Sequence, residues 1–368
     1  ISCFFSSSFS MIQGLGISVL SRIHLEYQAF LSAKSKHASD LLPDIRSLWK
    51  ALTQERADSL SDYFRKPALR RAYLGYYMPL YVIKIASLLE SLHLNFKNPK
   101  VLDLGAGPLS GIFGAHLAFG GLGKSVAVDR EIGPMRAGLE FFEALLEDKK
   151  LDIKLCRANL KGPPYFWKPD FKPDIIIMAH MLNEFGSGAR HLETKHLLIS
   201  QAMSLLDKNG ILVIIEPASK VSSRDIMSLR DVLYEENQVK IIAPCPEVKN
   251  CPLLMSRNNW CHAEFPHQRP KELLEIDRKI GFDREFLKCS YLVLAKPEAG
   301  YKHQDFRIVS GLMNADGVLR RYACTSKGLL TLSQSVRDKT QILGLLTRGE
   351  AVSPESWPKN LIQITKES

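Results

Sequence analysis

The sequence predicts an α/β fold with a doubly wound parallel sheet, an N-terminal helical lobe before it and a small β-rich C-terminal region after it. Three observations support this prediction. Short apolar runs alternate with helical segments from residue 100 onward, as is typical of parallel strands joined by crossover helices. Apolar residues recur at three- and four-residue steps over 41–94. Short strand-like runs with turn signals fill the end of the chain.

Length and composition describe a globular protein with a basic surface. The 368 residues are enough for a sizeable core, and the 45% hydrophobic and 24% charged content is ordinary. No run of roughly 18 or more apolar residues appears, so we expect no membrane span. The 49 Lys and Arg against 39 Asp and Glu give a formal charge of +10. This surplus favours a polyanionic partner such as RNA, or an anionic membrane surface.

We divide the chain into four segments: a tail and lead-in at 1–40, a helical lobe at 41–97, a core at 98–298 with a cysteine-rich insertion at 243–270, and a β-rich region at 299–368. The first 22 residues are Ser-rich and lack acidic residues, as in a mitochondrial transit peptide. However, Arg22 is their only Arg, and Met11 offers an alternative start. We therefore expect a bacterial cytoplasmic protein, with the mitochondrial matrix as the alternative.

The helical lobe shows apolar periodicity over 41–64 and again over 70–94. Near the start of the second stretch, basic residues are interleaved with tyrosines. These residues are Arg65, Lys66, Arg70 and Arg71, with Tyr73, Tyr76 and Tyr77. Basic residues among aromatics can bind phosphates and stack on bases. We expect a helix with a solvated basic side and aromatics in the core, and we keep RNA binding by the four basic residues as the alternative.

The core alternates strands and helices in chain order. The predicted strands cover 100–107, 125–131, 152–160, 173–185 and 210–219, and the predicted helices cover 110–119, 134–148 and 196–206. Further strand-like runs lie at 290–297, 306–313, 317–326 and 329–334. We expect these later runs partly to complete the sheet and partly to extend past it.

A glycine turn, "DLGAGPLSG", follows the first strand. It places Asp103, Gly105 and Gly107 at the carboxyl end of that strand, where open parallel sheets bind ligands. Glycine allows the backbone to approach a ligand closely. A dinucleotide fingerprint would need a further glycine where Ser110 stands. An acidic residue two positions before the first glycine instead resembles class I S-adenosylmethionine (SAM) methyltransferases.

This resemblance implies that SAM is a cofactor of the protein. It assigns the Asp103 carboxylate to the methionine end of SAM, with Gly105 and Gly107 forming the turn beneath the cofactor. Asp129, which ends the second strand in "VAVDRE", matches the acidic residue that binds the ribose hydroxyls. Asn159 in "CRANL" falls where the adenine is usually contacted.

The sequence departs from the methyltransferase pattern at two places. Leu109 stands where the pattern has its third glycine. At the end of the fourth strand, "MAHMLNEF" contains neither an Asp/Asn-Pro-Pro-aromatic motif for amino methylation nor a Pro-Cys nucleophile for cytosine C5 chemistry. Asn183 and Glu184 are the candidate catalytic residues in this segment, and the alternative is that they cap the next helix or close the cofactor pocket. Methyl transfer therefore stays open.

Three of the seven cysteines lie close together, as Cys245, Cys251 and Cys261 in a C-x5-C-x9-C spacing, with His262 next to the last one. An odd number of cysteines without secretory features favours a reducing compartment over a disulfide framework. In a loop interrupted by prolines, these thiols can converge on one centre. Zinc would accept the three thiolates together with His262, although zinc sites usually begin with a shorter cysteine spacing.

An iron–sulfur cluster would instead need a fourth thiolate. Cys324 in "RRYACTSKG" can supply it from a strand-like segment late in the chain. Cys289 is the competing candidate, although a buried position in which it packs as a small apolar residue suits it better. At this level the zinc and iron–sulfur interpretations both stand.

The cysteine segment "APCPEVKNCPL…NNWCHAEF" closely resembles a methyltransferase-like family of small-subunit ribosome-assembly proteins, with mitochondrial members and bacterial relatives. Other segments agree over about 40–360: "ALRRAYLGYYMPLYVIKI", "DLGAGPLSG", "HMLNEF", "EPAS", "SYLVLAK" and "YACTSKG". The resemblance implies a SAM-type fold and a [4Fe–4S] cluster, whose ligands would be Cys245, Cys251, Cys261 and Cys324. His262 would then be a neighbour of the cluster, and Trp260 would shield it from solvent.

From this resemblance we expect a small-subunit assembly factor that binds small-subunit rRNA and the small ribosomal subunit. Two alternatives stand beside it: an active SAM-dependent rRNA methyltransferase, and a redox- or iron-sensing regulator of translation. We expect a monomer with no membrane partner.

Overall fold

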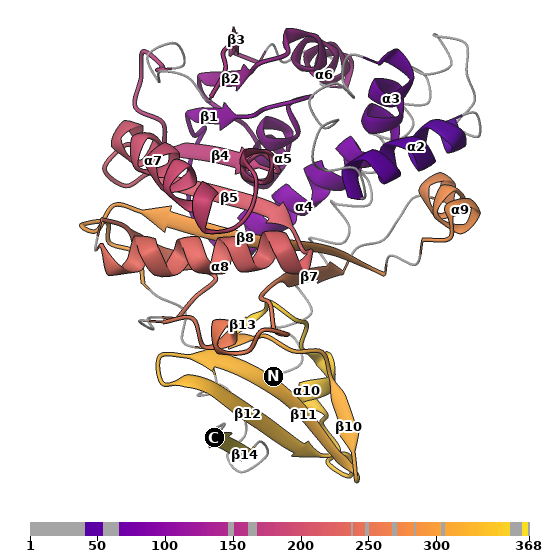
Figure 1. The fold of residues 1–368 in the computed structure, drawn as a ribbon, viewed down its shortest axis with the longest axis vertical. Coiled ribbons are helices and arrows are strands. Elements are labelled where there is room, and N and C mark those ends of the chain that lie inside the picture. Colours follow the sequence, from indigo (N-terminus) through magenta and orange to yellow (C-terminus); the bar gives the residue numbers. More distant parts are fainter. Residues whose placement is uncertain are drawn as a thin grey trace. The chain divides into compact units, whose positions relative to one another are not determined.

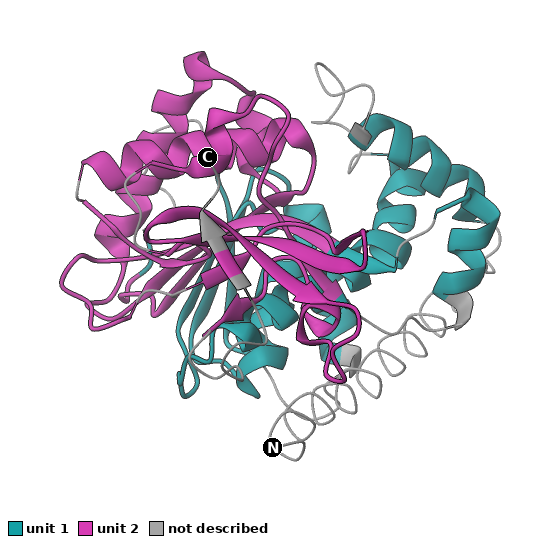
Figure 2. Ribbon diagram, turned by 90° about the horizontal axis from the view of Figure 1, so that it is seen from below, with its two compact units in different colours: residues 1–169, 266–287 teal, residues 170–265, 288–368 magenta. Residues whose placement is uncertain are grey.

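The computed structural model describes residues 41–53, 66–145, 151–160, 168–236, 238–246, 250–266, 271–282, 285–302, 306–353 and 363–366. The predicted tail at 1–40 and Arg65 lie outside these ranges. The chain divides into two compact units, coloured in Figure 2. Unit 1 comprises residues 1–169 and 266–287, and unit 2 comprises residues 170–265 and 288–368. The four segments inferred from the sequence stay a prediction.

Unit 1 begins with the predicted helical lobe. Its helices are α2 (Leu42–Thr53), α3 (Pro67–Ala72), the π-helix η3 (Tyr73–Tyr77) and α4 (Met78–Ser91). A further helix of this unit, α9 (Lys271–Ile280), was not predicted. It is tied to the lobe by a hydrogen bond from the Tyr76 hydroxyl to the Asp277 carboxylate and by one of 2.7 Å from Arg46 Nη2 to the Lys279 carbonyl oxygen. Distant parts of the chain therefore complete this lobe.

One continuous helical stretch, Pro67–Ser91, is long and apolar enough to cross a membrane by length and composition alone. It is 89% buried inside the protein over its most apolar window. A buried core helix meets the same criteria, so this stretch is only weak evidence for a membrane span.

The first strands and helices of the core agree closely with their prediction. Three parallel strands stand in the order β3-β2-β1 within unit 1: β1 (Val101–Leu104), β2 (Ser125–Asp129) and β3 (Ile153–Arg157). Helices α5 (Ser110–Phe119) and α6 (Ile132–Leu145) follow β1 and β2. All four residues of β1 are buried, which is why the segment is almost continuously apolar.

In unit 2 the strand order is β4-β5-β8-β6, with β7 pairing β8. The strands are β4 (Ile175–Ala179), β5 (Ile211–Pro217), β6 (Lys240–Ala243), β7 (Ala263–Pro266) and β8 (Phe286–Ala295). The helical elements between them are η5 (Leu182–Phe185), α7 (Ala189–Leu205), α8 (Lys220–Glu235) and η6 (Pro252–Met255). Figure 1 shows α8 running alongside β8.

Strand β8 is antiparallel to both β5 and β6, so those two strands are parallel to each other. The chain passes from β5 through α8 to β6, and later returns as β8 between them. The sheet is therefore parallel-dominated, with β8 antiparallel to β5 and β6. This confirms the predicted α/β class with its parallel-dominated sheet, and it confirms that 290–297 helps to complete the sheet.

A second sheet of unit 2 accounts for the β-rich end of the chain. Its strands are β9 (Phe306–Ile308), β10 (Met313–Ala315), β11 (Val318–Thr325), β12 (Gly328–Ser335), β13 (Ala351–Val352) and β14 (Gln363–Lys366). Their order is β13-β9-β11-β12-β14, with β10 pairing β11, and every pairing is antiparallel (Figure 1). The short helix α10 (Ile342–Leu345) contributes Leu343 to the apolar core beneath the strands.

Candidate functional site

The predicted glycine turn connects β1 to α5 within unit 1. Gly105, Gly107 and Leu109 have positive φ angles of 75°, 48° and 66°. The backbone amides of Gly105 and Ala106 both donate to the Val128 carbonyl oxygen of β2, at 2.8 and 3.1 Å. The turn is thus left-handed at three positions and fastened to the neighbouring strand, which gives it a defined shape.

Leu109 occupies the place of the third glycine without changing the backbone conformation that a glycine would adopt there. A non-glycine residue in the left-handed region costs roughly 1–2 kcal/mol. The Leu109 side chain is fully buried, and burying a leucine contributes about 1.5–3 kcal/mol. Burial therefore offsets the backbone cost, and the departure from the pattern leaves the turn intact.

Asp103 lies buried beneath the first turn of α5, with 1% of its surface exposed. Its Oδ2 accepts a hydrogen bond of 3.3 Å from the Ile112 amide. A Cβ atom on Gly111 would stand 2.5 Å from the same oxygen, so glycine at this position makes room for the carboxylate. Burial raises the pKa of Asp103 to about 7, and the nearby Asp129 charge adds to the rise. A cationic group would stabilise the ionised form.

Asp129 joins the end of β2 to the turn. Its Oδ2 accepts from the Gly107 amide at 3.0 Å, and its Oδ1 accepts from the Glu131 amide at 2.9 Å. Burial raises the pKa of Asp129, while these two amides oppose the rise. A carboxylate offers about four acceptor positions, so Asp129 can still accept hydrogen bonds from hydroxyl groups. Asn159, directly after β3, is exposed.

The chemistry of unit 1 fits the predicted cofactor. A buried carboxyl suits an ammonium group, a second carboxylate suits vicinal hydroxyls, and an exposed amide suits a base edge. The helix α6 packs directly on the turn, since a Cβ on Gly138 would meet the Pro108 carbonyl oxygen at 2.2 Å. The assignment of these five residues to SAM therefore stays a prediction. The carboxyl, amide and glycine groups that the structure places in unit 1 agree with it.

The candidate catalytic residues of unit 2 lie directly after β4, in the short 3-10 helix η5. Asn183 and Glu184 are half-buried there. The Glu184 amide donates to the Met181 carbonyl oxygen at 3.1 Å. These observations describe a local turn, and the catalytic role of both residues stays a prediction.

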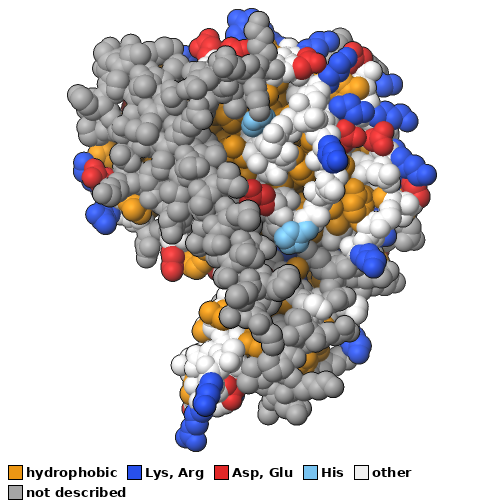
Figure 3. Space-filling model, turned by 180° about the vertical axis from the view of Figure 1, so that it is seen from behind, with side chains coloured by type: hydrophobic (Ala, Val, Ile, Leu, Met, Phe, Trp, Pro, Cys, Tyr) orange, Lys and Arg blue, Asp and Glu red, His pale blue; other side chains and the backbone are white. Residues whose placement is uncertain are grey.

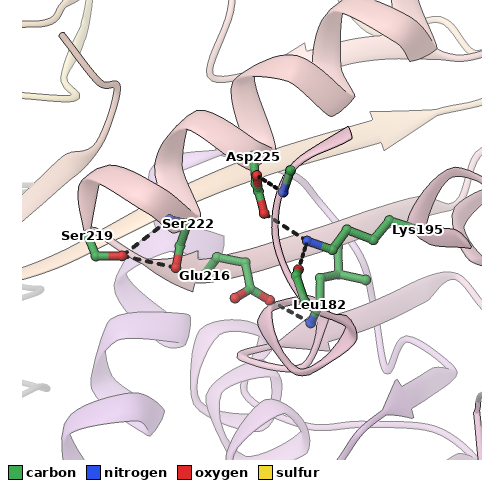
Figure 4. A network of polar contacts seen from close by, with 8 residues as sticks. Leu182, Lys195, Glu216, Ser219, Ser222 and Asp225 are labelled. Carbon is green, nitrogen blue, oxygen red and sulfur yellow. Dashed lines mark hydrogen bonds and ion pairs between the residues drawn. The ribbon is translucent and has the colours of Figure 1, made fainter. Parts of the chain in front are cut away.

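Glu216 is a buried carboxyl at the end of β5 that the sequence interpretation did not select. Its Oε1 accepts from the Leu182 amide at 2.8 Å and so holds the start of η5 (Figure 4). Burial raises the pKa of Glu216 to about 8, against the opposing effects of the Leu182 amide and the Lys195 charge. An acidic residue within the apolar run "GILVIIEP" was the available signal.

An ion pair of Lys195 and Asp225 supports the same region. Lys195 Nζ lies 2.9 Å from Asp225 Oδ2 and donates to the Gly186 carbonyl oxygen at 2.6 Å. Asp225 Oδ1 accepts from the Gly188 amide at 3.1 Å (Figure 4). Both glycines have positive φ, at 87° and 84°. The pair therefore fixes the loop between η5 and α7 to the helix α8.

The structure brings the four predicted cysteine ligands into one place in unit 2. Cys245 follows β6, Cys251 precedes η6, Cys261 precedes β7, and Cys324 lies in β11. All four line a single cavity of about 30 Å³, together with Ile226, Met227, Arg230, Pro244, Pro246, Leu253, Ser290, Tyr291, Leu292, Arg307 and Val309. Cys289 is fully buried in β8 and is not among these lining residues.

Burial and neighbouring thiols raise the pKa values of Cys245, Cys251 and Cys324. Burial raises the pKa of Cys251 to about 12, and the neighbouring Cys245 and Cys261 raise it further. Burial also raises the pKa of Cys324 and of Cys245. Without a bound metal, these three groups are therefore neutral thiols at neutral pH, and a metal would have to displace their protons.

A site for one metal ion is not found among the described residues: no group of three or more His, Cys, Asp or Glu there could hold an ion. Zinc draws its ligands to about 2.0–2.3 Å from a single point, whereas a four-iron cluster spreads four thiolates around a larger body. The described lining of the cavity contains four Cys and no His, Asp or Glu. This donor set is that of an iron–sulfur cluster or of a four-cysteine zinc ion.

His262 lies outside the cavity lining. Its Nε2 is 2.9 Å from Arg348 Nη1 and 3.4 Å from Glu264 Oε1. Burial lowers the pKa of His262 to about 4, and the Arg348 charge adds to the lowering. The imidazole is therefore neutral at neutral pH and already engaged with Arg348. This arrangement supports His262 as a neighbour and gives no support to a Cys3His zinc site.

Helix α8, absent from the predicted elements, provides the support for the cysteine loop. Asp231 accepts from the Cys251 amide at 3.1 Å on both oxygens, and its Oδ1 lies 2.6 Å from Arg230 Nη1. Arg224 Nη1 donates to the carbonyl oxygens of Ser256 and Asn259 at 2.8 and 2.9 Å. The loop is thus held at several backbone positions by side chains of one helix.

Trp260 packs at the edge of the apolar cluster that contains Cys251 and Cys324. Its indole N–H donates to the Ala218 carbonyl oxygen at 3.1 Å. It is half-buried, so its ring covers part of the thiol cluster. The shielding role inferred from the resemblance stays a prediction.

The basic segment of the helical lobe has its tyrosines in the core: Tyr73, Tyr76 and Tyr77 are all buried, as expected. Stacking of these rings on RNA bases is therefore not available. Lys66 is exposed, while Arg70 and Arg71 are half-buried. On the face drawn in Figure 3, described Lys and Arg side chains lie interspersed with Asp and Glu.

A family model described as "Mitochondrial small ribosomal subunit Rsm22" matches residues 70–341 of the chain. No curated protein sequence matches this chain.

The chain is distantly similar to several solved structures. NSun6 from Pyrococcus horikoshii is 16% identical with a TM-score of 0.37, covering 60% of this chain and 52% of that chain. Precorrin-6y C5,15-methyltransferase from Geobacter metallireducens is 16% identical with a TM-score of 0.34, over 58% and 87% of the two chains. The plantazolicin methyltransferase BamL is 11% identical with a TM-score of 0.38, over 71% and 98%. TM-scores this low do not establish the fold, so the fold is assigned from the strand order described above.

Proposed function

The chain belongs to the mitochondrial small ribosomal subunit Rsm22 family, and from this membership we propose that it is a small-subunit assembly factor with a methyltransferase-like fold, which binds small-subunit rRNA and carries a [4Fe–4S] cluster. One observation supports the cluster most directly. Four cysteines from separate elements line one cavity whose described lining offers no competing His or carboxylate ligand. The family description also favours the mitochondrial matrix, the second of the two compartments considered.

Cys245, Cys251, Cys261 and Cys324 would hold the cluster. Such a cluster supplies a rigid cross-link and can exchange one electron. The chain's own contribution is to hold the cysteine loop on α8, through the Asp231 bonds to the Cys251 amide. Metal binding that depends on folded geometry stabilises the fold that provides it. We therefore assign the cysteines a structural role first, and redox or iron sensing is the alternative.

SAM binding is the second part of the proposal. Asp103 and Asp129 would hold its ammonium group and ribose, on the turn formed by Gly105 and Gly107, and Asn159 would contact the adenine. SAM supplies an electrophilic methyl group when bound. An active rRNA methyltransferase is the alternative function, and a deletion strain tests it: an unchanged rRNA modification map rules it out.

Binding to rRNA draws its support from the formal charge of +10. Contacts between basic side chains and phosphates release counterions, so affinity should fall steeply as salt rises. Affinity for small-subunit rRNA that is weak, and unchanged between low and moderate salt, would contradict this part of the proposal. Lys66, Arg70 and Arg71 are the first residues to substitute, together with Arg65 beside them.

The cluster is tested by anaerobic purification of the wild-type protein and of two serine variants. We expect a brown wild-type protein with about four iron and four sulfide per chain. Cys324→Ser should lose the visible absorption and most of the iron. Cys289→Ser is the matched control, because this buried cysteine lies outside the cavity lining, and it should keep both. A colourless wild-type protein with one zinc per chain would refute the cluster.

A further inference from the structure

Arg307 is a fully buried cation next to the four thiols. It lies in β9, with 1% of its surface exposed. In the antiparallel pair of β9 and β11 it stands directly opposite Cys324, so both side chains are on the same face of the sheet. Arg307 also lines the cavity that the four cysteines share. One strand pairing therefore places a guanidinium group beside the fourth thiol.

The partners of Arg307 do not include a carboxylate in the described parts of the chain. Its Nη1 donates to the Tyr291 hydroxyl at 2.8 Å, and its guanidinium carbon lies 4.9 Å from the centroid of the same ring. Its Nε is buried without a hydrogen-bond partner there. The other groups that act on its charge are Cys261 and Cys245. Arg230, the second arginine in the lining, differs because it pairs with Asp231 at 2.6 Å.

A buried guanidinium without an anion is strongly unfavourable, and arginine cannot relieve the penalty by losing its proton. Cysteines bind a metal group as thiolates, and four thiolates around a cluster leave a net negative charge in a site of low dielectric. Among the described residues Arg307 has no negatively charged partner. Cysteines bound to a metal group would supply that negative charge as thiolates.

We propose that Arg307 is the counter-charge of the metal group bound by the four cysteines, retaining that group in the cavity and setting its reduction potential. This inference rests on the proposed function. It assigns opposite effects to the arginine in the two states. Arg307 destabilises the metal-free protein, in which its charge is unpaired, and it stabilises the loaded protein.

The test compares Arg307→Gln and Arg307→Lys with the wild type in the full chain. Glutamine removes the charge but keeps a donor for the Tyr291 hydroxyl, and lysine keeps the charge without the planar fork. Arg321→Gln is the matched control. This buried arginine of β11 donates to the carbonyl oxygens of Leu343 and Ser310, at 2.6 and 3.1 Å, and is not among the cavity-lining residues.

Three measurements follow anaerobic reconstitution with iron and sulfide. In Arg307→Gln we expect iron loss to a chelator on the order of a hundredfold faster than in the wild type, because one partner of a buried charge pair is gone. We expect a more negative midpoint potential for one-electron reduction by dithionite, since the added electron no longer has a cation beside it. After chelation and desalting, we expect Arg307→Gln to unfold at a higher urea concentration than metal-free wild type. Arg307→Lys should stay nearer to the wild type in all three.

The outcomes separate this inference from the cluster itself. Wild-type protein that takes up no iron and sulfide refutes both. Wild-type protein that binds the cluster, together with an Arg307→Gln variant of equal iron retention and equal potential, overturns the role of Arg307 and leaves the cluster in place. If Arg307→Gln lowers the stability of the metal-free protein as Arg321→Gln does, the arginine has a packing role only, and the inference is likewise overturned.

Discussion

The substitution Asp103→Asn should remove most of the pH dependence that the buried Asp103 carboxyl gives to the free energy of unfolding. The pKa of Asp103 is raised from 3.8 to about 7 in the folded state, chiefly by burial. The folded state therefore binds more protons than the unfolded chain between these values, so the stabilisation is complete below about pH 4 and is lost as the pH rises through 7. At about 1.4 kcal/mol per pKa unit, the full loss is roughly 4 kcal/mol.

The assay is urea unfolding of wild type and Asp103→Asn between about pH 4.5 and pH 8. Across this window the free energy of unfolding of the wild type should fall by roughly 3 kcal/mol more than that of the variant. Asparagine keeps an oxygen that can accept from the Ile112 amide, so the variant removes the charge and little else. Glu216, whose pKa is also raised, to about 8, titrates in both proteins and cancels from the difference.

Asp316→Asn is the control, because Asp316 lies exposed in the turn between β10 and β11. Parallel pH profiles for wild type and Asp103→Asn would refute the buried, protonated state of Asp103. A ligand ammonium needs the ionised carboxylate, so SAM affinity should fall by up to about tenfold per pH unit below 7 in the wild type. In Asp103→Asn this part of the pH dependence should be absent.

Two further substitutions test the packing around the candidate sites. Gly111→Ala places a Cβ 2.5 Å from Asp103 Oδ2 and should lower the free energy of unfolding by about 1–3 kcal/mol, whereas Gly344→Ala, where the nearest atom is 3.8 Å away, should change it little in the same urea titration. Asp231→Asn leaves the buried Arg230 guanidinium without its carboxylate and should cost about 3–5 kcal/mol. It should also weaken the Cys251 amide bonds, and normal iron retention in this variant would contradict the support that we assign to α8.

The first half of the core could be predicted from the sequence because each element has one dominant local signal. The helix Ser110–Phe119 agrees with its prediction at both ends, since a glycine turn precedes it and Gly120 in the left-handed conformation ends it. The strands of unit 1 and the first strands of unit 2 are short apolar runs bounded by breaks. Their parallel pairing follows from the helices between them.

Helix α8 escaped prediction because its buried positions are not all apolar. Ser222, Ser223 and Arg230 are buried along it, at 5%, 0% and 1% exposure, so the inward face does not appear as an apolar stripe. Arg230 lines the cavity and pairs with Asp231, and Ser222 hydrogen-bonds with the N-cap residue Ser219. The antiparallel direction of β8 was missed for a different reason: it depends on the long return through α9, which leaves no local signal.

The choice between a Cys3His site and a four-cysteine site could not be made from cysteine spacing, because the deciding contacts are tertiary. Locally, His262 is as near to Cys261 as any ligand could be, yet its imidazole is engaged with Arg348 at 2.9 Å and lies outside the cavity lining. The fourth thiol, Cys324, instead comes from β11, and the register of β9 and β11 places Arg307 directly opposite it. The cysteine motif shows only which thiols are close in sequence. Only the pairing of strands shows that a buried arginine, with no carboxylate partner among the described residues, stands beside Cys324.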